Sequence, residues 1–366
     1  MSVCRLRGFA TASMKALAYS SMAPTAQSPF FQFPPCGRPR HVLSYCHLNR
    51  LASLPQGMTR IFGGYFFMPK VKYTKPYQSI EQQIALLESR GLVIDVDADV
   101  AKRFLANVNY YRFTGYALPF LASREQFRAG SKFSYIRDVY RFDRRLRDFM
   151  SDALEAVELS FRALFARQFT KVHGALGYLD PLSFPPANIQ HHKTVTEKFK
   201  EEFNRSDEVC AKHFRNTYDD PPLWAIVEVV SFGALVRLYR ISSKADQNNI
   251  SSRYGFRGDI LASYLQHLVV VRNLCAHHSR MYDRRFSYKF PMPLAWRSIH
   301  GVDTAMLFSQ FALIYRMLAP TDSSVFDRIV WRSNLCKFLK KIPKNPICDH
   351  SQRAGIPSSP LKSPLW

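Results

Sequence analysis

The residues best suited to chemistry lie in one short segment, 271–280, which reads Val-Arg-Asn-Leu-Cys-Ala-His-His-Ser-Arg. Arg272 is followed by Asn273, and His277 lies four residues beyond the asparagine. At about 100° per residue, Asn273 and His277 share one face of a helix, and Arg280 falls near it. Arg272 is about 140° from His277, so its long side chain must curl round the helix to act on the same bound group.

These residue types are the ones that RNA cleavage without a metal needs. A histidine, with an ordinary pKa of about 6.5, can remove the 2′-hydroxyl proton or protonate the leaving 5′ oxygen. A guanidinium can stabilise the charge that gathers on the phosphate, and an amide can fix the histidine tautomer. Arg272, Asn273 and His277 are therefore the candidate catalytic residues, with His278 as an equally available imidazole. One such set is sparse, so we expect two copies to face each other, most simply in a homodimer.

The spacing of these residues alone does not exclude a chance pattern without function. A loose pattern of arginine, four to six residues and histidine arises readily by chance, and Arg167 with His173 and Arg40 with His47 also match it. Either histidine of the segment could be an ordinary surface residue.

The charge of the chain indicates its class of partner. Its 366 residues hold 51 Lys and Arg against 28 Asp and Glu, a net charge of +23. Such a surplus favours a polyanion, which means RNA, DNA or an acidic membrane surface. The sequence has no helix-turn-helix signal of the kind that DNA-binding proteins show. It also lacks a run of about 18 apolar residues, so we expect no membrane span.

The cysteines argue against a metal or disulfide framework. There are seven, without a CxxC pair, which favours a reducing cytoplasm. Cys46-His47 and Cys348-Asp349-His350 are partial metal-ligand patterns, but neither has a second ligand pair at usable spacing. We therefore expect no metal and no cofactor.

The first 80 residues differ from the rest, because they contain ten Lys or Arg and no Asp or Glu. A transit peptide has such a composition, whereas a secretory signal would need an apolar core that is missing here. A start codon assigned too early is the interpretation we favour, with Met68 as the natural beginning. Residues 1–67 are then a non-native or disordered extension.

Apolar periodicity predicts an all-α fold. The expected helices cover 79–91, 97–108, 135–172, a short stretch of 194–203, 221–240, 259–282, 304–317 and 337–341. The aromatic segment 109–120 is expected to be a packed turn, with base stacking as the alternative. One face of the long helix is expected to be solvated or to contact phosphate, and it carries Arg141, Arg144, Arg145, Asp148 and Arg162.

Several segments in a fixed order resemble a known family. Arg272-Asn-Leu-Cys-Ala-His-His-Ser-Arg-Met-Tyr-Asp-Arg284 is similar to the HEPN signature as it occurs in Abi-like proteins of the AbiD/AbiF group. Other segments also resemble that group. They are residues 109–116, residues 142–147 continuing to Ala156-Val-Glu158, residues 177–180, and residues 221–224 with 231–233. Together they cover about residues 73–320. Where the family often has an indole after this stretch, Tyr282 stands here.

The resemblance implies a HEPN-like helical bundle with additional helices, working in bacterial abortive infection as a toxin that cleaves RNA. It implies catalytic roles for Arg272, Asn273 and His277, an orienting role for Glu158, and the binding of a small noncoding RNA that restrains the toxin. His278 and Arg280 would support RNA binding. The domains expected are the extension 1–67, an Abi-like domain over 68–320 and a basic, partly helical tail over 321–366.

Two functions from different classes therefore compete. The first is a cytoplasmic, metal-independent endoribonuclease acting as a homodimer on host or phage RNA. The second is a non-catalytic RNA-binding or interaction module, in which Arg272 and His277 only contact phosphate. A membrane-surface or DNA-binding protein is a third, weaker interpretation.

Overall fold

The computed structural model describes residues 72–74 and 76–366. The expectations for residues 1–67, and for Cys46-His47 as a metal-ligand pattern, lie outside the described residues.

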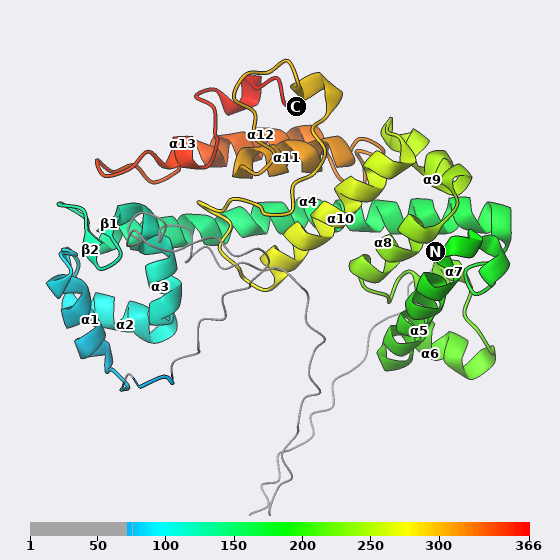
Figure 1. Cartoon of the computed structure of the whole chain (residues 1–366), viewed down its shortest axis with the longest axis horizontal. Helices are drawn as coiled ribbons and strands as arrows, with labels where there is room; N and C mark the ends of the chain where they lie inside the picture. Colours follow the sequence, from blue (N-terminus) through cyan, green and yellow to red (C-terminus); the bar gives the residue numbers. More distant parts are fainter. Residues whose placement is uncertain (1–71, 75) are drawn as a thin grey trace, which may run out of the picture. The chain divides into compact units, whose positions relative to one another are not determined.

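A single long helix organises the described chain (Figure 1). This helix, α4 (Phe133–His173), has 41 residues, which makes it about 60 Å long at 1.5 Å per residue. It confirms the prediction for 135–172. The helix ends at Gly174, whose φ of +78° suits glycine. At Gly177 a Cβ atom would lie 2.3 Å from the carbonyl oxygen of His173, so only glycine fits the turn that follows.

Short elements precede α4: α1 (Ile80–Ser89), α2 (Ala98–Asn107), α3 (Tyr110–Ala117) and the antiparallel hairpin of β1 (Leu121–Ser123) and β2 (Gln126–Phe127). The first two helices confirm the predictions for 79–91 and 97–108. Ser79 caps α1 in a full capping box, and Asp97 accepts two backbone N–H groups at the start of α2.

The expectation of a packed turn over 109–120 is wrong, because most of this segment is the helix α3. The side chain of Asn109 accepts the Tyr111 N–H at 2.9 Å and so begins the helix. Phe113 and Tyr116, three residues apart, are buried against α4, while Tyr111 stays exposed. Tertiary burial of one aromatic face outweighs the weak helix propensity of the sequence.

Six helices follow α4 as far as the candidate site: α5 (Ile189–Arg205), α6 (Val209–Thr217), α7 (Leu223–Ile226), α8 (Phe232–Ile241), α9 (Lys244–Ser251) and α10 (Gly258–Ala276). α10 packs against α4, α8 and α9, and α7 packs against α4. The short helix predicted over 194–203 is longer than expected, because α5 extends beyond both of its ends.

The single helix predicted over 221–240 is wrong, because the chain breaks between α7 and α8. Ser231 begins α8 as its N-cap, and its own N–H donates to the Glu202 carboxylate at 2.7 Å. The Ser231 hydroxyl donates to the same carboxylate at 3.0 Å. A contact with α5, distant in sequence, therefore fixes a break that local apolar periodicity conceals.

The chain after α10 returns to α4 through α11 (Leu307–Met317) and α12 (Arg328–Leu339), followed by the short α13 (His350–Arg353). The helix predicted over 304–317 is confirmed from residue 307 onward. The basic helix predicted over 337–341 is instead the end of α12. Phe338 of α12 stacks on Phe142 and Phe149 of α4, with ring centroids 4.6 Å and 4.9 Å apart.

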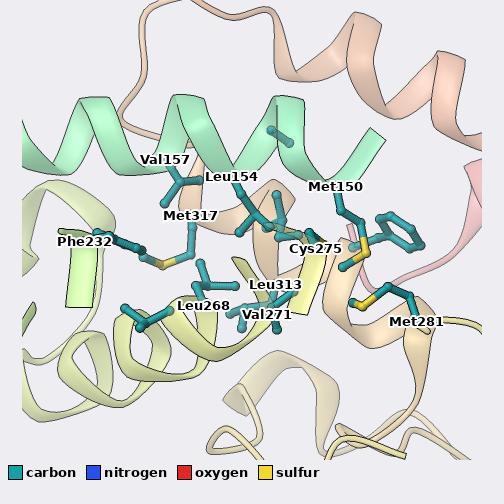
Figure 2. Close-up of a cluster of buried hydrophobic side chains, with 14 of the residues drawn as sticks. Met150, Leu154, Val157, Phe232, Leu268, Val271, Cys275, Met281, Leu313 and Met317 are labelled. Carbon is teal, nitrogen blue, oxygen red and sulfur yellow. The ribbon is translucent and has the colours of Figure 1, made fainter. Parts of the chain in front are cut away.

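The all-α prediction is confirmed, since the small hairpin is the one sheet in the described part of the chain. Short 3-10 helices occupy Leu118–Phe120, Pro181–Ser183, Pro186–Asn188, Ser252–Tyr254, Leu294–Trp296 and Pro360–Lys362. Figure 2 shows the centre of the core, where side chains of α4, α10 and α11 meet. None of the described helices is long and apolar enough to span a membrane.

Candidate functional site

The core orients the candidate site by fixing which face of α10 is buried. Leu268, Val271 and Cys275 pack into the cluster of Figure 2 with Leu154 and Val157 of α4. Residues on the opposite side of α10 from this buried stripe therefore face outward. Asn273 and His277 are exposed and Arg272 is partly exposed. The outward face of α10 thus presents the three candidate catalytic residues at its carboxyl end.

The helix predicted over 259–282 ends early, at Ala276, so that His277 is the C-cap. The His277 N–H still donates to the Asn273 carbonyl at 2.9 Å, which keeps these two residues one turn apart. The Ser279 N–H donates to the Leu274 carbonyl at 2.8 Å and the His278 N–H to the Cys275 carbonyl at 3.0 Å. These two bonds form a Schellman ending.

In a Schellman ending, the first residue after the C-cap is usually glycine. Here it is His278, with a φ of +54°. A left-handed conformation is strained for a residue with a Cβ atom. Arg112 of α3 donates to the His278 carbonyl at 2.6 Å, which holds the strained residue in place. Such strain often marks a functional segment.

Arg272 is tethered to α4 by a carboxylate. Its Nε lies 3.3 Å from Glu158 Oε2, and its Nη1 lies 3.5 Å from Asn273 Oδ1. The Glu158 side chain is 10% exposed and that of Arg272 is 42% exposed. The carboxylate therefore holds the guanidinium from inside, while part of the fork faces solvent. The structure thus brings Glu158 and Arg272 together, and the orienting role of Glu158 stays a prediction.

The other oxygen of Glu158 accepts a hydrogen bond from Arg162, one turn along α4. Arg162 also donates to the carbonyl of Val227, just after α7. The expectation that Arg162 lies on a solvated face is wrong, because the residue is only 7% exposed. Arg162 forms a buried ion pair with Glu158, and the Val227 carbonyl accepts a further hydrogen bond from it. A buried charge requires such partners. Arg141, Arg144, Arg145 and Asp148 are exposed as expected.

A cavity of about 320 Å³ opens beside Arg272. Its lining includes Arg162 and Arg272 together with three acidic residues, Glu155, Glu158 and Glu228. Ala276, the residue before His277, also lines it. Arg272 thus lines a recess whose lining includes the residue immediately before His277.

A buried carboxylate that sequence reasoning missed holds the loop after His278. Asp143 of α4 accepts the Tyr282 N–H at 2.6 Å and the Met281 N–H at 3.2 Å. It also accepts the Tyr116 hydroxyl at 2.5 Å and Arg147 Nη1 at 2.7 Å. Its side chain is fully buried. A signal was present in the sequence, because Asp and Arg four residues apart lie on the apolar stripe of α4.

Arg280 is not on the face of α10, because the helix ends before it. Its Nη1 lies 3.7 Å from Asp283 Oδ2, on the far side of the loop. Asp283 in turn accepts two hydrogen bonds from Arg353 of α13, at 2.8 Å and 3.0 Å. The structure therefore joins Arg272 to Glu158 and Asn273 and places His277 one turn after Asn273. Arg280 instead pairs with Asp283, which Arg353 of the carboxyl-terminal segment also contacts.

The neighbouring Cys275 is buried in the core. Burial raises the pKa of the Cys275 thiol to about 12, although Arg147 acts in the opposite direction. The thiol is therefore neutral and unreactive near neutral pH. Among the described residues, no group of three or more His, Cys, Asp or Glu is arranged to hold a metal ion.

Comparison with known proteins identifies the family. The family model described as "Abi-like protein" matches residues 103–283, from α2 through the loop that follows α10. Neither the curated proteins nor the solved structures gave a significant match. The matched region contains α4 with Asp143 and Glu158, as well as the whole Arg272–His277 segment. By this match the chain belongs to the Abi-like proteins.

Proposed function

We propose that this Abi-like protein is a metal-independent endoribonuclease of the HEPN type. Membership of the family implies a part in abortive infection, a form of phage defence. One geometric observation carries the finer proposal. Glu158 holds a partly exposed Arg272 guanidinium at the mouth of a cavity, and the exposed His277 follows one residue after the cavity lining.

The chemistry assigns a role to each side chain. His277 would act as general base on the 2′-hydroxyl, or as general acid on the 5′ oxygen. The 2′ oxygen attacks the phosphorus and the bond to the 5′ oxygen breaks, which leaves a 2′,3′-cyclic phosphate and a 5′-hydroxyl. The Arg272 fork would stabilise the phosphate charge in the transition state. Asn273, exposed one turn before His277, would orient the phosphate or the imidazole.

A homodimer completes this proposal. The base and the acid of the reaction are two proton-transfer roles, whereas each chain offers one His277 beside one Arg272. Two chains with their α10 ends facing each other would supply both. The strongly basic chain would attract RNA as substrate, and a small noncoding RNA could occupy the same surface as a regulator.

The test is cleavage of total cellular RNA with all metal chelated. The wild-type protein is expected to cut RNA and leave cyclic-phosphate ends, whereas Arg272→Ala and His277→Ala are expected to abolish cutting and retain RNA binding. His191→Ala and Arg253→Ala are matched controls, because both side chains are exposed and lie outside the site. Salt-sensitive RNA binding without cleavage by any variant would establish the non-catalytic binding module instead. Undiminished cleavage by His277→Ala would overturn the nuclease assignment.

A further inference from the structure

A second cavity lies further along α4, toward its carboxyl end. Its volume is about 510 Å³, and it lies between α4 and α7. Arg167, Thr170 and Lys171 line it from α4, and Trp224 lines it from α7. None of these residues belongs to the candidate catalytic set. The cavity therefore needs an explanation of its own.

Trp224 is exposed, and hydrogen bonds fix the backbone of the residues just before it. The indole is 52% exposed, and no ring contact or hydrogen bond engages it within the described residues. The chain before it is fixed, because Tyr178 donates to the Pro221 carbonyl at 2.8 Å and the Leu223 N–H donates to the Ala175 carbonyl at 2.9 Å. The hydrogen-bonded segment before Trp224 thus places a large aromatic side chain in the lining of the cavity. The side chain does not pack against another ring among the described residues.

The polar groups of the cavity lack partners. Arg167 and Lys171 are exposed one helical turn apart, and neither has an ion pair or hydrogen bond to a described residue. The Thr170 hydroxyl between them is buried and also has no hydrogen-bond partner in the described chain. Glu228 also lines the cavity, so its two cations exceed its acids by one. An aromatic face beside a surplus of cations that form no ion pair is the combination that binds a base and its phosphates in single-stranded nucleic acid.

The two cavities lie on one path. Glu228 lines both of them. Arg162 lines the catalytic cavity and donates to the carbonyl of Val227, which lines the second. Arg167 is nine residues beyond Glu158 on the same helix, which is a rise of about 13 Å along the helix axis at 1.5 Å per residue. A strand with its reacting phosphate at Arg272 would reach the second cavity within a few nucleotides.

We propose that the Trp224 cavity is a binding subsite for an unpaired nucleotide flanking the cleavage position in single-stranded RNA. The base stacks on Trp224, and the adjoining phosphates contact Arg167 and Lys171. A base in a duplex cannot reach the indole, so the subsite selects single strands. This inference rests on the proposed function for its substrate, but its test measures binding and not cleavage.

The experiment measures the affinity of a short labelled single-stranded RNA for the full chain carrying His277→Ala. Adding Trp224→Ala is expected to weaken binding about 5- to 150-fold, the range for loss of one base stack. Trp224→Phe, which keeps an aromatic face, should restore most of the affinity. Tyr218→Ala is the matched control, because Tyr218 is a similarly exposed aromatic residue outside both cavities near Arg272 and Trp224. On an abasic strand, Trp224→Ala and its parent should bind equally.

The phosphate contacts have a separate readout in the salt dependence of binding. Arg167→Gln with Lys171→Gln should reduce the slope of log affinity against log salt by about 1.4, at roughly 0.7 per phosphate on a single strand. The control pair Lys244→Gln with Arg253→Gln, also exposed and unpaired within the described part of the chain, should leave the slope unchanged.

The outcomes separate this inference from the nuclease assignment. If Trp224→Ala binds RNA as tightly as its parent, or loses as much affinity for abasic RNA, the subsite is overturned even where the wild-type protein cleaves. A change in oligomeric state with unchanged RNA affinity would make Trp224 part of a protein interface and also overturn it. If the wild-type protein never cleaves but Trp224→Ala weakens binding as expected, the subsite stands and the nuclease assignment fails.

Discussion

Glu158 Oε2 lies 3.3 Å from Arg272 Nε and so joins the middle of α4 to the exposed end of α10. The other oxygen of the same carboxylate is bound by Arg162. One buried acid therefore faces two guanidinium groups, of which one is buried and the other is open to the cavity. This arrangement orients Arg272 without covering it.

The first prediction concerns this tether. Glu158→Gln removes the charge but keeps the shape, so Arg272 should sample more orientations. We expect the cleavage rate at saturating RNA to fall on the order of 10- to 100-fold, since small misplacements at a reacting centre have effects of this size. RNA affinity should change little. Glu155→Gln is the matched control, because Glu155 lines the same cavity and has no ion pair with a described residue. Equal rates for the two variants would show that Glu158 does not position Arg272.

The second prediction concerns Asp143, which anchors the loop after His278. Asp143→Asn leaves Arg147 without its buried counter-charge and places an amide N–H₂ where donors now converge. Breaking a buried ion pair in this way destabilises by about 3–5 kcal/mol. Urea unfolding should show this loss, whereas Asp148→Asn, at an exposed position of the same helix, should lie within about 0.5 kcal/mol of the wild type. A similar stability for both variants would contradict the anchoring role.

Sequence periodicity could predict the helices because most of them bury one regular apolar stripe. α4 is the clearest case, and its length was predicted to within two residues at its start and one at its end. The predicted ranges of the first two helices begin at Ser79 and Asp97, which are the N-caps of α1 and α2, and a cap is a local interaction. The placement of Asn273 and His277 on one outward face also followed from local geometry.

The features that sequence reasoning missed depend on contacts between distant residues. The break before α8 is fixed by Glu202 of α5, and the burial of Arg162 by Glu158 together with the Val227 carbonyl. The early end of α10 has a different cause. Glycine usually marks such an ending, and here His278 stands in its place.

The third prediction tests the strain at His278. With a φ of +54°, this position should favour glycine over alanine, the reverse of the order inside a helix. His278→Gly is therefore expected to be more stable than His278→Ala by about 1 kcal/mol. At Ala276, the last residue of α10, replacement by glycine should instead destabilise by up to about 1 kcal/mol. Thermal unfolding of the variants measures both differences. If alanine is the better residue at 278, the left-handed ending is wrong.

The fourth prediction concerns pH and the carboxyl-terminal segment. His350 is 2% exposed, and its imidazole is hydrogen-bonded by the Tyr282 hydroxyl and lies 2.6 Å from Asn345 Nδ2. Burial lowers the pKa of His350 from 6.5 to about 4, with Arg353 acting in the same direction and Asp283 against it. The folded protein therefore keeps this histidine neutral over a range in which the unfolded chain binds a proton.

The sign of the effect follows from that difference. Between pH 6.5 and pH 4 the unfolded chain binds more protons, so the stability contributed by neutral His350 is full above pH 6.5 and is lost as the pH falls toward 4. The loss amounts to about 3 kcal/mol at 1.36 kcal/mol per unit. Urea unfolding at a series of pH values should show a shallower dependence in His350→Gln than in the wild type. His191→Gln, which changes an exposed histidine, should keep the wild-type dependence. An unchanged slope in His350→Gln would mean that this histidine is protonated in the folded chain, and that the carboxyl-terminal segment does not bury it beside Tyr282.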